Sequence, residues 1–494
     1  MTSETLTDHS AASAAPISAE TAARNRLVIG LLLVSTFVVF LNETIMSVAI
    51  PRLMEDLGVT AGLAQWLTTA FLLTMAVVIP ITGFLLQRFN TRPIFVLAMS
   101  VFSAGTLVCA MAPGIELLIV GRVVQAVGTA IMMPLLMTTV MTLVPPLQRG
   151  RTMGNISIVM SVAPAIGPTI AGLILTYLDW RWMFILVLPI ALGALALGYA
   201  RIQNVTTPRY APLDVISVIL SALAFGGLVY GLSSLGEAAH SASVVPGWVP
   251  IAVGLVAMAI FVARQLTLQK QDRALLDLRT FGSLNYTLSV VMMAVAMMAL
   301  FGTVILLPIY TQNVVGIDTL QTGLLLLPGS LLMGVMGPVV GRLYDRYGTT
   351  PLLVPGTILV AAVMWLLTLV DQNTPIWGIL AGHVTISVGL ALMFTPLFTA
   401  SLSSLPMRLY SHGSAILGSA QQVAGAAGVA LLVAVMTLQS EALGRAGLAP
   451  VDALGGGIRA GFMCGAVISL IAIVLAFLVK KPPANPEMAG MGGH

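Results

Sequence analysis

The chain has 494 residues, of which 58% are hydrophobic and only 8% are charged. This composition lies outside the range of soluble globular proteins, so the sequence predicts an integral membrane protein embedded in a lipid bilayer. The formal net charge of +4 is too small and too dispersed to favour a nucleic-acid partner. Cys109 and Cys464 are the only cysteines, and they offer neither a disulfide framework nor a metal site.

Fourteen apolar stretches are each long enough, at about 20 residues, to cross the hydrocarbon core of a bilayer. The predicted transmembrane helices span residues 27–50, 63–86, 93–112, 115–143, 153–178, 183–200, 213–235, 248–267, 284–309, 320–341, 351–370, 375–404, 413–438 and 459–479. The predicted fold class is therefore an all-α integral membrane protein with 14 transmembrane helices.

Residues 1–26 are polar and rich in Ala, Ser and Thr, which predicts a disordered tail ahead of an uncleaved first helix. An even number of spans puts both termini on one side of the membrane. If that side is the cytoplasm, the outer loops keep only Arg52, Arg181, Arg445 and Arg459 as basic residues. Because cytoplasmic loops carry an excess of Lys and Arg, we expect both termini in the cytoplasm and a multi-pass protein of the inner membrane.

Two motifs occur twice at nearly the same spacing. The segment at 83–93 resembles that at 341–351, and Gly121-Arg122-Val123 corresponds to Gly382-His383-Val384. Parallel repeats of this kind are typical of transporters, which bind substrate between the two halves near the middle of the membrane. The repeat predicts two six-helix bundles joined by a two-helix insert. The predicted boundaries are 1–26 for a cytoplasmic tail, 27–201 and 283–480 for the bundles, 202–282 for the insert with its linkers, and 481–494 for a second tail.

The repeated segments resemble the major facilitator superfamily, and within it the 14-helix drug:proton antiporters of the lincomycin-resistance and multidrug type. The family loop pattern G-x-L-x-D-R-x-G-R-R is matched in the second half by Gly341, Leu343, Asp345, Arg346 and Gly348. In the first half it is matched by Gly83, Leu85 and Arg88, whereas Gln87 replaces the acid. In the family this loop steadies the outward-facing state through its carboxylate, so the resemblance implies a weaker latch in the first half.

The fourth and fifth spans carry two further patterns of the same family. R-x-x-Q-G-x-G-x-A is matched by Arg122, Gln125, Gly128 and Ala130. The antiporter pattern G-x8-G-x3-G-P-x2-G-G is matched by Gly154, Gly167, Pro168 and Gly172, and Pro164 lies one turn before Pro168. Small residues allow helices to approach closely, and proline loosens a helix. The resemblance therefore implies that the fifth span seals the cavity and acts as its hinge.

Arg122 is a charge at membrane depth, where it is costly unless it faces the bundle interior or a water-filled cavity. Glu43 in the first span lies at a similar depth, because both residues are about seven or eight positions from the outer ends of their spans. In the family the first and fourth helices line the central cavity, so the resemblance implies that these two residues share one wall. The acid of many relatives aligns with Asn42, about 100° away from Glu43 on a helix.

A buried carboxylate that holds either a proton or a cationic substrate, but not both, provides the simplest mechanism of exchange. We therefore predict that Glu43 and Arg122 couple transport to protons. His383, the counterpart of Arg122 in the second half, is a further candidate because histidine titrates near pH ~6.5. The alternatives are a static Glu43–Arg122 ion pair and a His383 that serves only in packing.

Several polar or adaptable side chains in the spans are candidates for the substrate cavity. They are Asn42, Gln125, Asn155, Gln312, Gln421 and Met133. Hydrogen bonds between helices explain the polar members of this set equally well. In the loop after the insert, the charges of Asp272, Arg273, Asp277 and Arg279 favour a solvated interfacial helix.

The sequence contains no P-loop and no H-E-x-x-H motif, so it does not indicate an ATPase, a metalloprotease or another enzyme, and no cofactor or metal is expected. The patterns together predict a monomeric, proton-coupled multidrug efflux antiporter whose partners are protons and lipophilic drugs, including cationic ones. One alternative is an exporter of a dedicated metabolite or lipid. Another is a membrane sensor that binds such compounds without transporting them.

Overall fold

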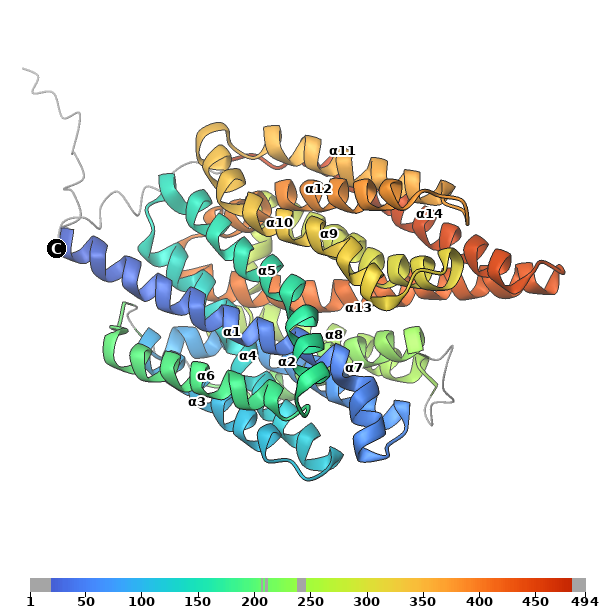
Figure 1. Ribbon diagram of the computed structural model, residues 1–494. Helices are drawn as coiled ribbons and strands as arrows, with labels where there is room; N and C mark the ends of the chain where they lie inside the picture. Colours follow the sequence, from blue (N-terminus) through green and yellow to red (C-terminus); the bar gives the residue numbers. More distant parts are fainter. Residues whose placement is uncertain (1–18, 206–207, 209–211, 238–245, 482–494) are drawn as a thin grey trace, which may run out of the picture.

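The computed structural model describes residues 19–205, 208, 212–237 and 246–481, which form a bundle of long helices (Figure 1). Within this part of the chain, 14 helices are long and apolar enough to cross a membrane, and no strand is formed. The predicted all-α class and the predicted number of spans are confirmed.

The helices follow one another with short connections. They are α1 (Ala19–Leu57), α2 (Ala61–Arg88), α3 (Thr91–Ala110), α4 (Ile115–Leu143), α5 (Arg149–Tyr177), α6 (Trp182–Arg201), α7 (Val215–Glu237), α8 (Trp248–Leu268), α9 (Leu284–Tyr310), α10 (Thr319–Tyr347), α11 (Thr350–Leu366), α12 (Ile376–Ser403), α13 (Tyr410–Arg445) and α14 (Pro450–Ala476). Shorter turns are η1 (Pro146–Gln148), η2 (Gln269–Gln271), η3 (Leu278–Gly282), η4 (Thr311–Val315), η5 (Leu367–Leu369) and η6 (Met407–Leu409).

Several helices extend beyond the predicted spans. α1 begins at Ala19 rather than at 27, and α14 begins at Pro450 rather than at 459. Asp345 and Arg346, which the sequence places in a loop, lie in the last turns of α10. Hydropathy detects only the part of a helix that lipid covers, whereas backbone hydrogen bonds continue the helix beyond it. Of the two predicted tails, residues 1–18 and 482–494 lie outside the described residues.

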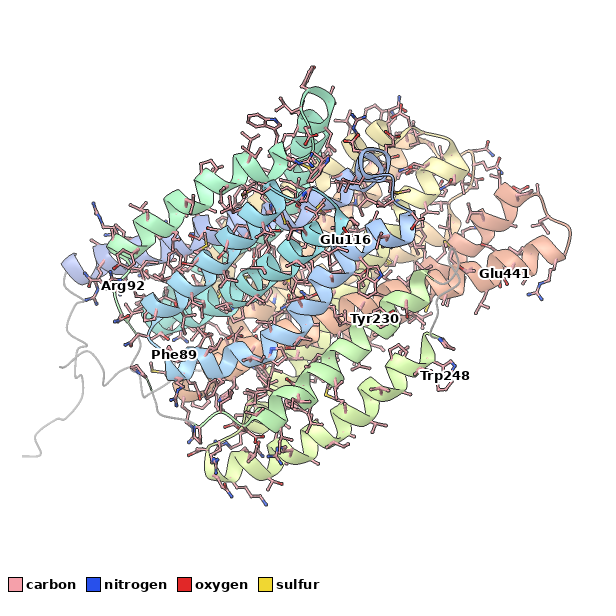
Figure 2. All side chains as sticks on the ribbon, turned by 90° about the horizontal axis from the view of Figure 1, so that it is seen from below. Phe89, Arg92, Glu116, Tyr230, Trp248 and Glu441 are labelled. Atoms are coloured by element: carbon pink, nitrogen blue, oxygen red, sulfur yellow. The ribbon has the colours of Figure 1, made fainter. Side chains whose placement is uncertain are left out.

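The helices that the repeat assigns to an insert are α7 and α8, and the helices before and after them, α1–α6 and α9–α14, are hereafter called the first and second halves. α7 contacts α8, and it also contacts α2 from the first half and α13 from the second. The rings of Trp66 on α2 and Tyr230 on α7 stack with their centroids 5.9 Å apart. A Cβ atom added to Gly254 of α8 would lie 2.7 Å from the backbone nitrogen of Leu228, so α7 and α8 are in close contact. Figure 2 shows this helix pair along one side of the bundle, with Tyr230 and Trp248 labelled.

The halves meet in two interfaces at the end of the bundle where α1 begins, hereafter the terminal end (left in Figure 1). α5 packs along α10, and α2 packs along α13. A Cβ atom on Gly154 would lie 2.2 Å from the carbonyl oxygen of Gly337, and one on Gly341 would lie 2.1 Å from that of Gly150. The backbones of α5 and α10 therefore touch directly, as small residues permit.

Gly154→Ala is expected to weaken the α5–α10 interface, because the new Cβ would meet a backbone carbonyl that cannot rotate away. Overpacking of this kind costs about 1–3 kcal/mol, so the Tm of the purified variant in detergent should fall. Gly193→Ala on α6 is the matched control, since nothing lies within 4 Å of a Cβ added there. A Tm in Gly154→Ala equal to that of the control would contradict the close contact.

Candidate functional site

Arg122 is positioned by the close packing of α4 against α3. A Cβ atom on Gly128 of α4 would lie 2.4 Å from the carbonyl oxygen of Ala98, and one on Gly121 would lie 2.5 Å from Cys109 Sγ. These glycines place one face of α4 directly on α3. Because successive residues turn by about 100° on a helix, Arg122 projects to the side, toward α1 and α2.

The guanidinium of Arg122 is buried, with only 1% of the residue exposed. Nη1 donates hydrogen bonds to Asn42 Oδ1 at 3.3 Å and to Gln125 Oε1 at 3.1 Å, and Nε donates to the Leu67 carbonyl at 3.4 Å. The charge also lies 4.0 Å from the centroid of the Phe71 ring, a favourable cation–π arrangement. Arg122 therefore faces the bundle interior, as its cost at membrane depth requires, rather than reaching out to the membrane surface.

Gln125 is held so that its carbonyl oxygen faces Arg122. The residue is fully buried, and Nε2 donates to Thr106 Oγ1 on α3 at 2.8 Å. Cys109 Sγ lies 3.8 Å from Gln125 Oε1. Thr106 and Cys109 were not predicted as parts of the site, because a lone Thr or Cys in an apolar run carries no pattern of its own. The Arg122 cluster, defined as Asn42, Phe71, Thr106, Arg122 and Gln125, thus joins α1, α2, α3 and α4.

Glu43 lies next to this cluster but is not hydrogen-bonded to it. Its Oε2 atom is buried and has no hydrogen-bond partner. Among the described residues, no ion pair of 4 Å or less joins Glu43 to Arg122, although the two charges are close enough to interact electrostatically. The static ion pair is therefore not formed. Asn42, at the position where relatives carry the acid, makes the direct contact instead.

The α1 segment that carries Glu43 packs on the antiporter pattern of α5. A Cβ atom on Gly167 would lie 2.3 Å from Thr44 Oγ1, which itself lies 3.5 Å from the carbonyl oxygen of Ala163. Gly172 has no atom within 4 Å of an added Cβ, so a close approach is found at Gly167 but not at Gly172. α5 continues as one helix through Pro164 and Pro168.

His383 on α12 packs against α10 within the second half. Its Nε2 atom lies 2.9 Å from the carbonyl oxygen of Leu326, and its Nδ1 atom is buried without a hydrogen-bond partner. A Cβ atom on Gly329 would lie 2.6 Å from the imidazole ring. No hydrogen bond or ion pair of the described residues joins His383 to Arg122 or Glu43.

The remaining cavity candidates are partly buried and lie on four different elements. Met133 is on α4, Asn155 on α5, Gln312 in the turn after α9, and Gln421 on α13. The polar contacts of Arg122 are those given above, so the structure does not bring these residues to it. Within the described part of the chain, no group of three His, Cys, Asp or Glu side chains is arranged to hold a metal ion.

The sequence profile of the Major Facilitator Superfamily matches residues 32–429. The chain belongs to this superfamily. YcnB of Bacillus subtilis (strain 168), an uncharacterized MFS-type transporter, is 40% identical over 466 residues, which cover 94% of this chain and 97% of YcnB. The lincomycin resistance protein LmrB of Listeria monocytogenes is 38% identical, over 92% of this chain and 96% of its own. A multidrug resistance protein B homolog of Mycobacterium tuberculosis is 29% identical, over 86% and 79%.

Solved structures of the superfamily share the fold. The human organic anion transporter MFSD10 superposes with a TM-score of 0.63 at 15% sequence identity, over 92% of this chain and 99% of that one. The proton:xylose symporter XylE superposes with a TM-score of 0.61 at 13% identity, over 92% and 96%. The predicted superfamily is confirmed, and its members are transporters rather than enzymes.

The superfamily loop pattern of the second half connects the two halves through hydrogen bonds between α10 and α5. Asp345 Oδ1 accepts a hydrogen bond from the Gly150 amide at 2.8 Å, and Oδ2 accepts one from the Arg151 amide at 2.8 Å. These amides belong to the first turn of α5, where an anion is favoured by the helix dipole. Arg346 is exposed, and its guanidinium lies 5.1 Å from the Tyr347 ring centroid.

The corresponding contact of the first half has a different chemistry. Gln87 Nε2 donates to the carbonyl oxygen of Arg408 at 3.1 Å, just before α13. A Cβ atom on Gly83 would lie 3.3 Å from Ala415 Cβ, so α2 and α13 are close here as well. Arg88 is the last residue of α2. The α2–α13 interface therefore contains no α2 carboxylate equivalent to Asp345.

Arg149 is a buried residue that contacts both halves and that the sequence did not mark as part of a site. It is 1% exposed, and it donates to the carbonyl oxygens of Met141 at 2.9 Å and Val144 at 3.2 Å. It also lies 3.5 Å from Ser403 Oγ at the end of α12 in the other half. A cation at the C-terminal end of α4 is favoured by the helix dipole. The positive-inside rule counts such a residue as part of a loop, and nothing in its spacing shows that it is buried.

Arg122→Lys is expected to lower the transport rate at least about tenfold, because an ammonium group cannot donate hydrogen bonds to Asn42, Gln125 and Leu67 with the planar geometry of a guanidinium. The positive charge is retained, so the lower rate would come from the lost hydrogen bonds. Uptake into vesicles, corrected for the amount of protein, measures it. Arg52→Lys is the matched control, as the Arg52 side chain is 56% exposed and its ion pairs within the described part of the chain are with Glu55 and Asp56 on its own helix. Equal transport rates in the two variants would show that transport does not depend on the guanidinium hydrogen bonds of Arg122.

Proposed function

We propose that this protein is a proton-coupled antiporter that exports lipophilic drugs, including cationic ones, across the cytoplasmic membrane. The observation that carries the proposal is the buried carboxylate oxygen of Glu43, which has no hydrogen-bond partner although it lies beside the Arg122 cluster. A buried carboxylate without hydrogen bonds is costly to keep charged. Either a bound proton or a bound cationic ligand stabilises the carboxylate, and it cannot hold both at once.

The hydrogen bonds of Arg122 explain why Glu43, rather than the arginine, is the group that changes its charge. The guanidinium is satisfied by neutral oxygens of Asn42, Gln125 and Leu67, so it remains a constant positive charge near the carboxylate. That charge favours release of the proton. Glu43 then alternates between a protonated form and a form that holds a cationic drug, and His383 is the second candidate for a proton-binding group.

Drug export is supported by the relatives. Proteins named for lincomycin resistance and multidrug resistance align with most of this chain. Substrates of this class are amphipathic or lipophilic, and a site of apolar and soft side chains suits them. The side chains proposed to line the substrate cavity are Asn42, Gln125, Met133, Asn155, Gln312 and Gln421.

Membrane orientation and conformational change are part of the same proposal. Both termini lie in the cytoplasm, so the terminal end is the cytoplasmic end, and residues 27–201 and 283–480 move as two units. In the arrangement described here the two halves are in contact at that end. The residues that stabilise this closed end are Gly83, Arg88, Gly341, Asp345 and Arg346. The residues that seal the cavity along α5 are Gly154, Pro164, Gly167, Pro168 and Gly172. The protein acts as a monomer.

Glu43→Gln is expected to abolish drug-driven proton movement, because the amide is similar in shape but cannot exchange a proton. Inverted vesicles are acidified inside by respiration, lincomycin or tetraphenylphosphonium is added, and proton release is followed with a fluorescent dye. Glu116→Gln is the matched control, as Glu116 is exposed at the start of α4 (Figure 2). Proton release by Glu43→Gln at the rate of the control would sink the assignment. Binding without proton movement in the unmodified protein would indicate a sensor.

His383→Gln is expected to retain proton release triggered by drug, at a rate within about threefold of the unmodified protein. The amide can still hydrogen-bond the Leu326 carbonyl, which is the one hydrogen-bond partner of the ring among the residues that the structure describes. The same vesicles measure this rate across pH. Complete loss of coupling in His383→Gln, with coupling kept in Glu43→Gln, would transfer the role of proton carrier to His383.

A further inference from the structure

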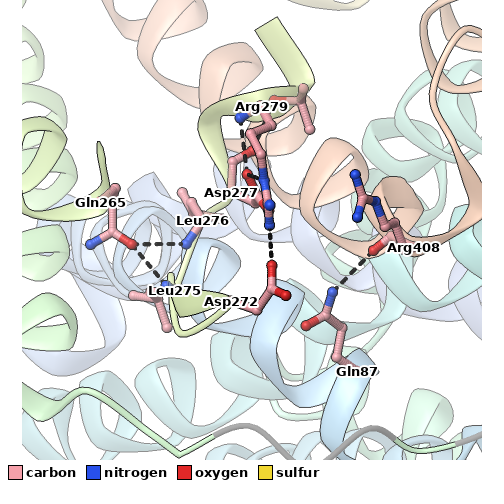
Figure 3. A network of polar contacts seen from close by, with 9 residues as sticks. Gln87, Gln265, Asp272, Leu275, Leu276, Asp277, Arg279 and Arg408 are labelled. Atoms are coloured by element: carbon pink, nitrogen blue, oxygen red, sulfur yellow. Dashed lines mark hydrogen bonds and ion pairs between the residues drawn. The ribbon is translucent and has the colours of Figure 1, made fainter. Parts of the chain in front are cut away.

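The loop between the insert and the second half forms a folded strap rather than a solvated helix. Residues 269–282, hereafter the insert strap, contain the short turns η2 and η3. Gln265 at the end of α8 is fully buried, and its Oε1 accepts hydrogen bonds from the Leu275 amide at 2.7 Å and the Leu276 amide at 3.3 Å (Figure 3). Its Nε2 donates to Ser217 Oγ of α7 at 2.7 Å. The insert therefore holds the strap in place.

The strap reaches from the insert into the main core of the protein. Leu275 and Leu276 are each 2% exposed and belong to the core cluster that both halves share. His412 of α13 is 4% exposed and lies next to the backbone of Leu275. Asp277 is only 3% exposed. The predicted helix is therefore wrong, and the prediction of solvated charges holds for Asp272 and Arg273 but not for the buried Asp277. The charge pattern does not show that Leu275 and Leu276 draw the chain inward.

Two carboxylates and one guanidinium of the strap form a compact ionic cluster. Arg279 is ion-paired with Asp272 and with Asp277, and its Nε donates to Asp277 Oδ1 at 2.9 Å. The hydrogen bonds to Asp277, and then those to Asp272, raise the pKa of the Arg279 guanidinium above its ordinary value. Two acids face one base, so these three side chains together carry one excess negative charge. The other two basic residues of the strap, Lys270 and Arg273, are exposed.

This cluster lies at the corner where the α2–α13 interface lacks a carboxylate. Asp272, Asp277 and Arg279 line a small cavity together with Gln87 of α2 and with Arg408 and His412 at the start of α13. Figure 3 shows Asp272 and Asp277 in the middle of the view, with Gln87 and Arg408 to their right. The free volume of the cavity is about 20 Å³, so these groups surround a space of roughly the size of one water molecule.

We propose that the carboxylates of Asp272 and Asp277 in the insert strap supply the negative charge that the first-half loop pattern has lost at Gln87. In the other interface, Asp345 places a carboxylate at the positive N-terminal end of α5. In this one, Gln87 is neutral and donates to a carbonyl, while Arg408 and the N-terminal end of α13 add positive charge. The strap carboxylates balance that charge from a third element. The insert thereby stabilises the closed terminal end of the α2–α13 interface.

Hydrogen–deuterium exchange of the full-length protein in lipid nanodiscs tests this inference. The paired substitution Asp272→Asn with Asp277→Asn should make the amides of residues 405–415 exchange about threefold faster, a size expected for charges near a helix end. Adding Gln87→Asp to that variant should restore slow exchange, because the charge returns to the interface from α2. Glu441→Gln, at the opposite end of α13 (Figure 2), is the matched control and should leave these amides unchanged.

The rescue separates an electrostatic role from a merely structural one. If the strap acted only by filling space, a carboxylate on α2 would not repair its loss. Unchanged exchange in the paired variant, or faster exchange that Gln87→Asp does not reverse, would each overturn the inference. Exchange of the α5 amides at residues 149–160 should stay constant throughout, because Asp345 holds the other interface independently.

Discussion

The burial of the Arg122 guanidinium is the constraint on which the first half of the structure depends. A charge inside an apolar bundle persists only when polar groups replace the water that it has lost. Here Asn42, Gln125 and the Leu67 carbonyl supply oxygens, and Phe71 supplies a ring face. Each comes from a fixed place on α1, α2 or α4, so satisfying one charge fixes how three helices meet. The glycine contacts between α3 and α4 then set the depth of the cluster.

The same constraint gives different roles to two neighbouring residues of α1, the amide Asn42 and the acid Glu43. Asn42 occupies the direct contact with Arg122, which leaves Glu43 beside the cluster and outside its hydrogen bonds. A carboxylate locked into an ion pair would be a poor carrier, since a proton or drug would have to displace the arginine. A carboxylate near a constant positive charge, but not hydrogen-bonded to it, can bind or release a proton without displacing the arginine. This balance is the physical basis of the antiport that we propose.

The halves are held at the terminal end by backbone contact and by charges at helix ends. In the α5–α10 interface, glycines bring the two backbones together, and Asp345 caps the first turn of α5 across the boundary. In the α2–α13 interface, an amide replaces the acid, and the insert strap brings its own carboxylates to the same corner. Each of these contacts contributes only a small free energy to the closed arrangement. A transporter needs such weak contacts, because its closed end must also open.

The sequence by itself determined the membrane class, the 14 spans, the two-fold repeat and the superfamily, because hydropathy, charge asymmetry and short motifs are local properties of the chain. It also indicated that Arg122 is buried, since a lone charge in the middle of an apolar span is stable only where it turns away from lipid. Only the tertiary structure decided that Asn42 rather than Glu43 contacts Arg122, that Thr106 orients Gln125, and that Arg149 and Asp277 are buried. Those outcomes depend on which faces of distant helices meet, and a single sequence does not encode that choice in any local pattern.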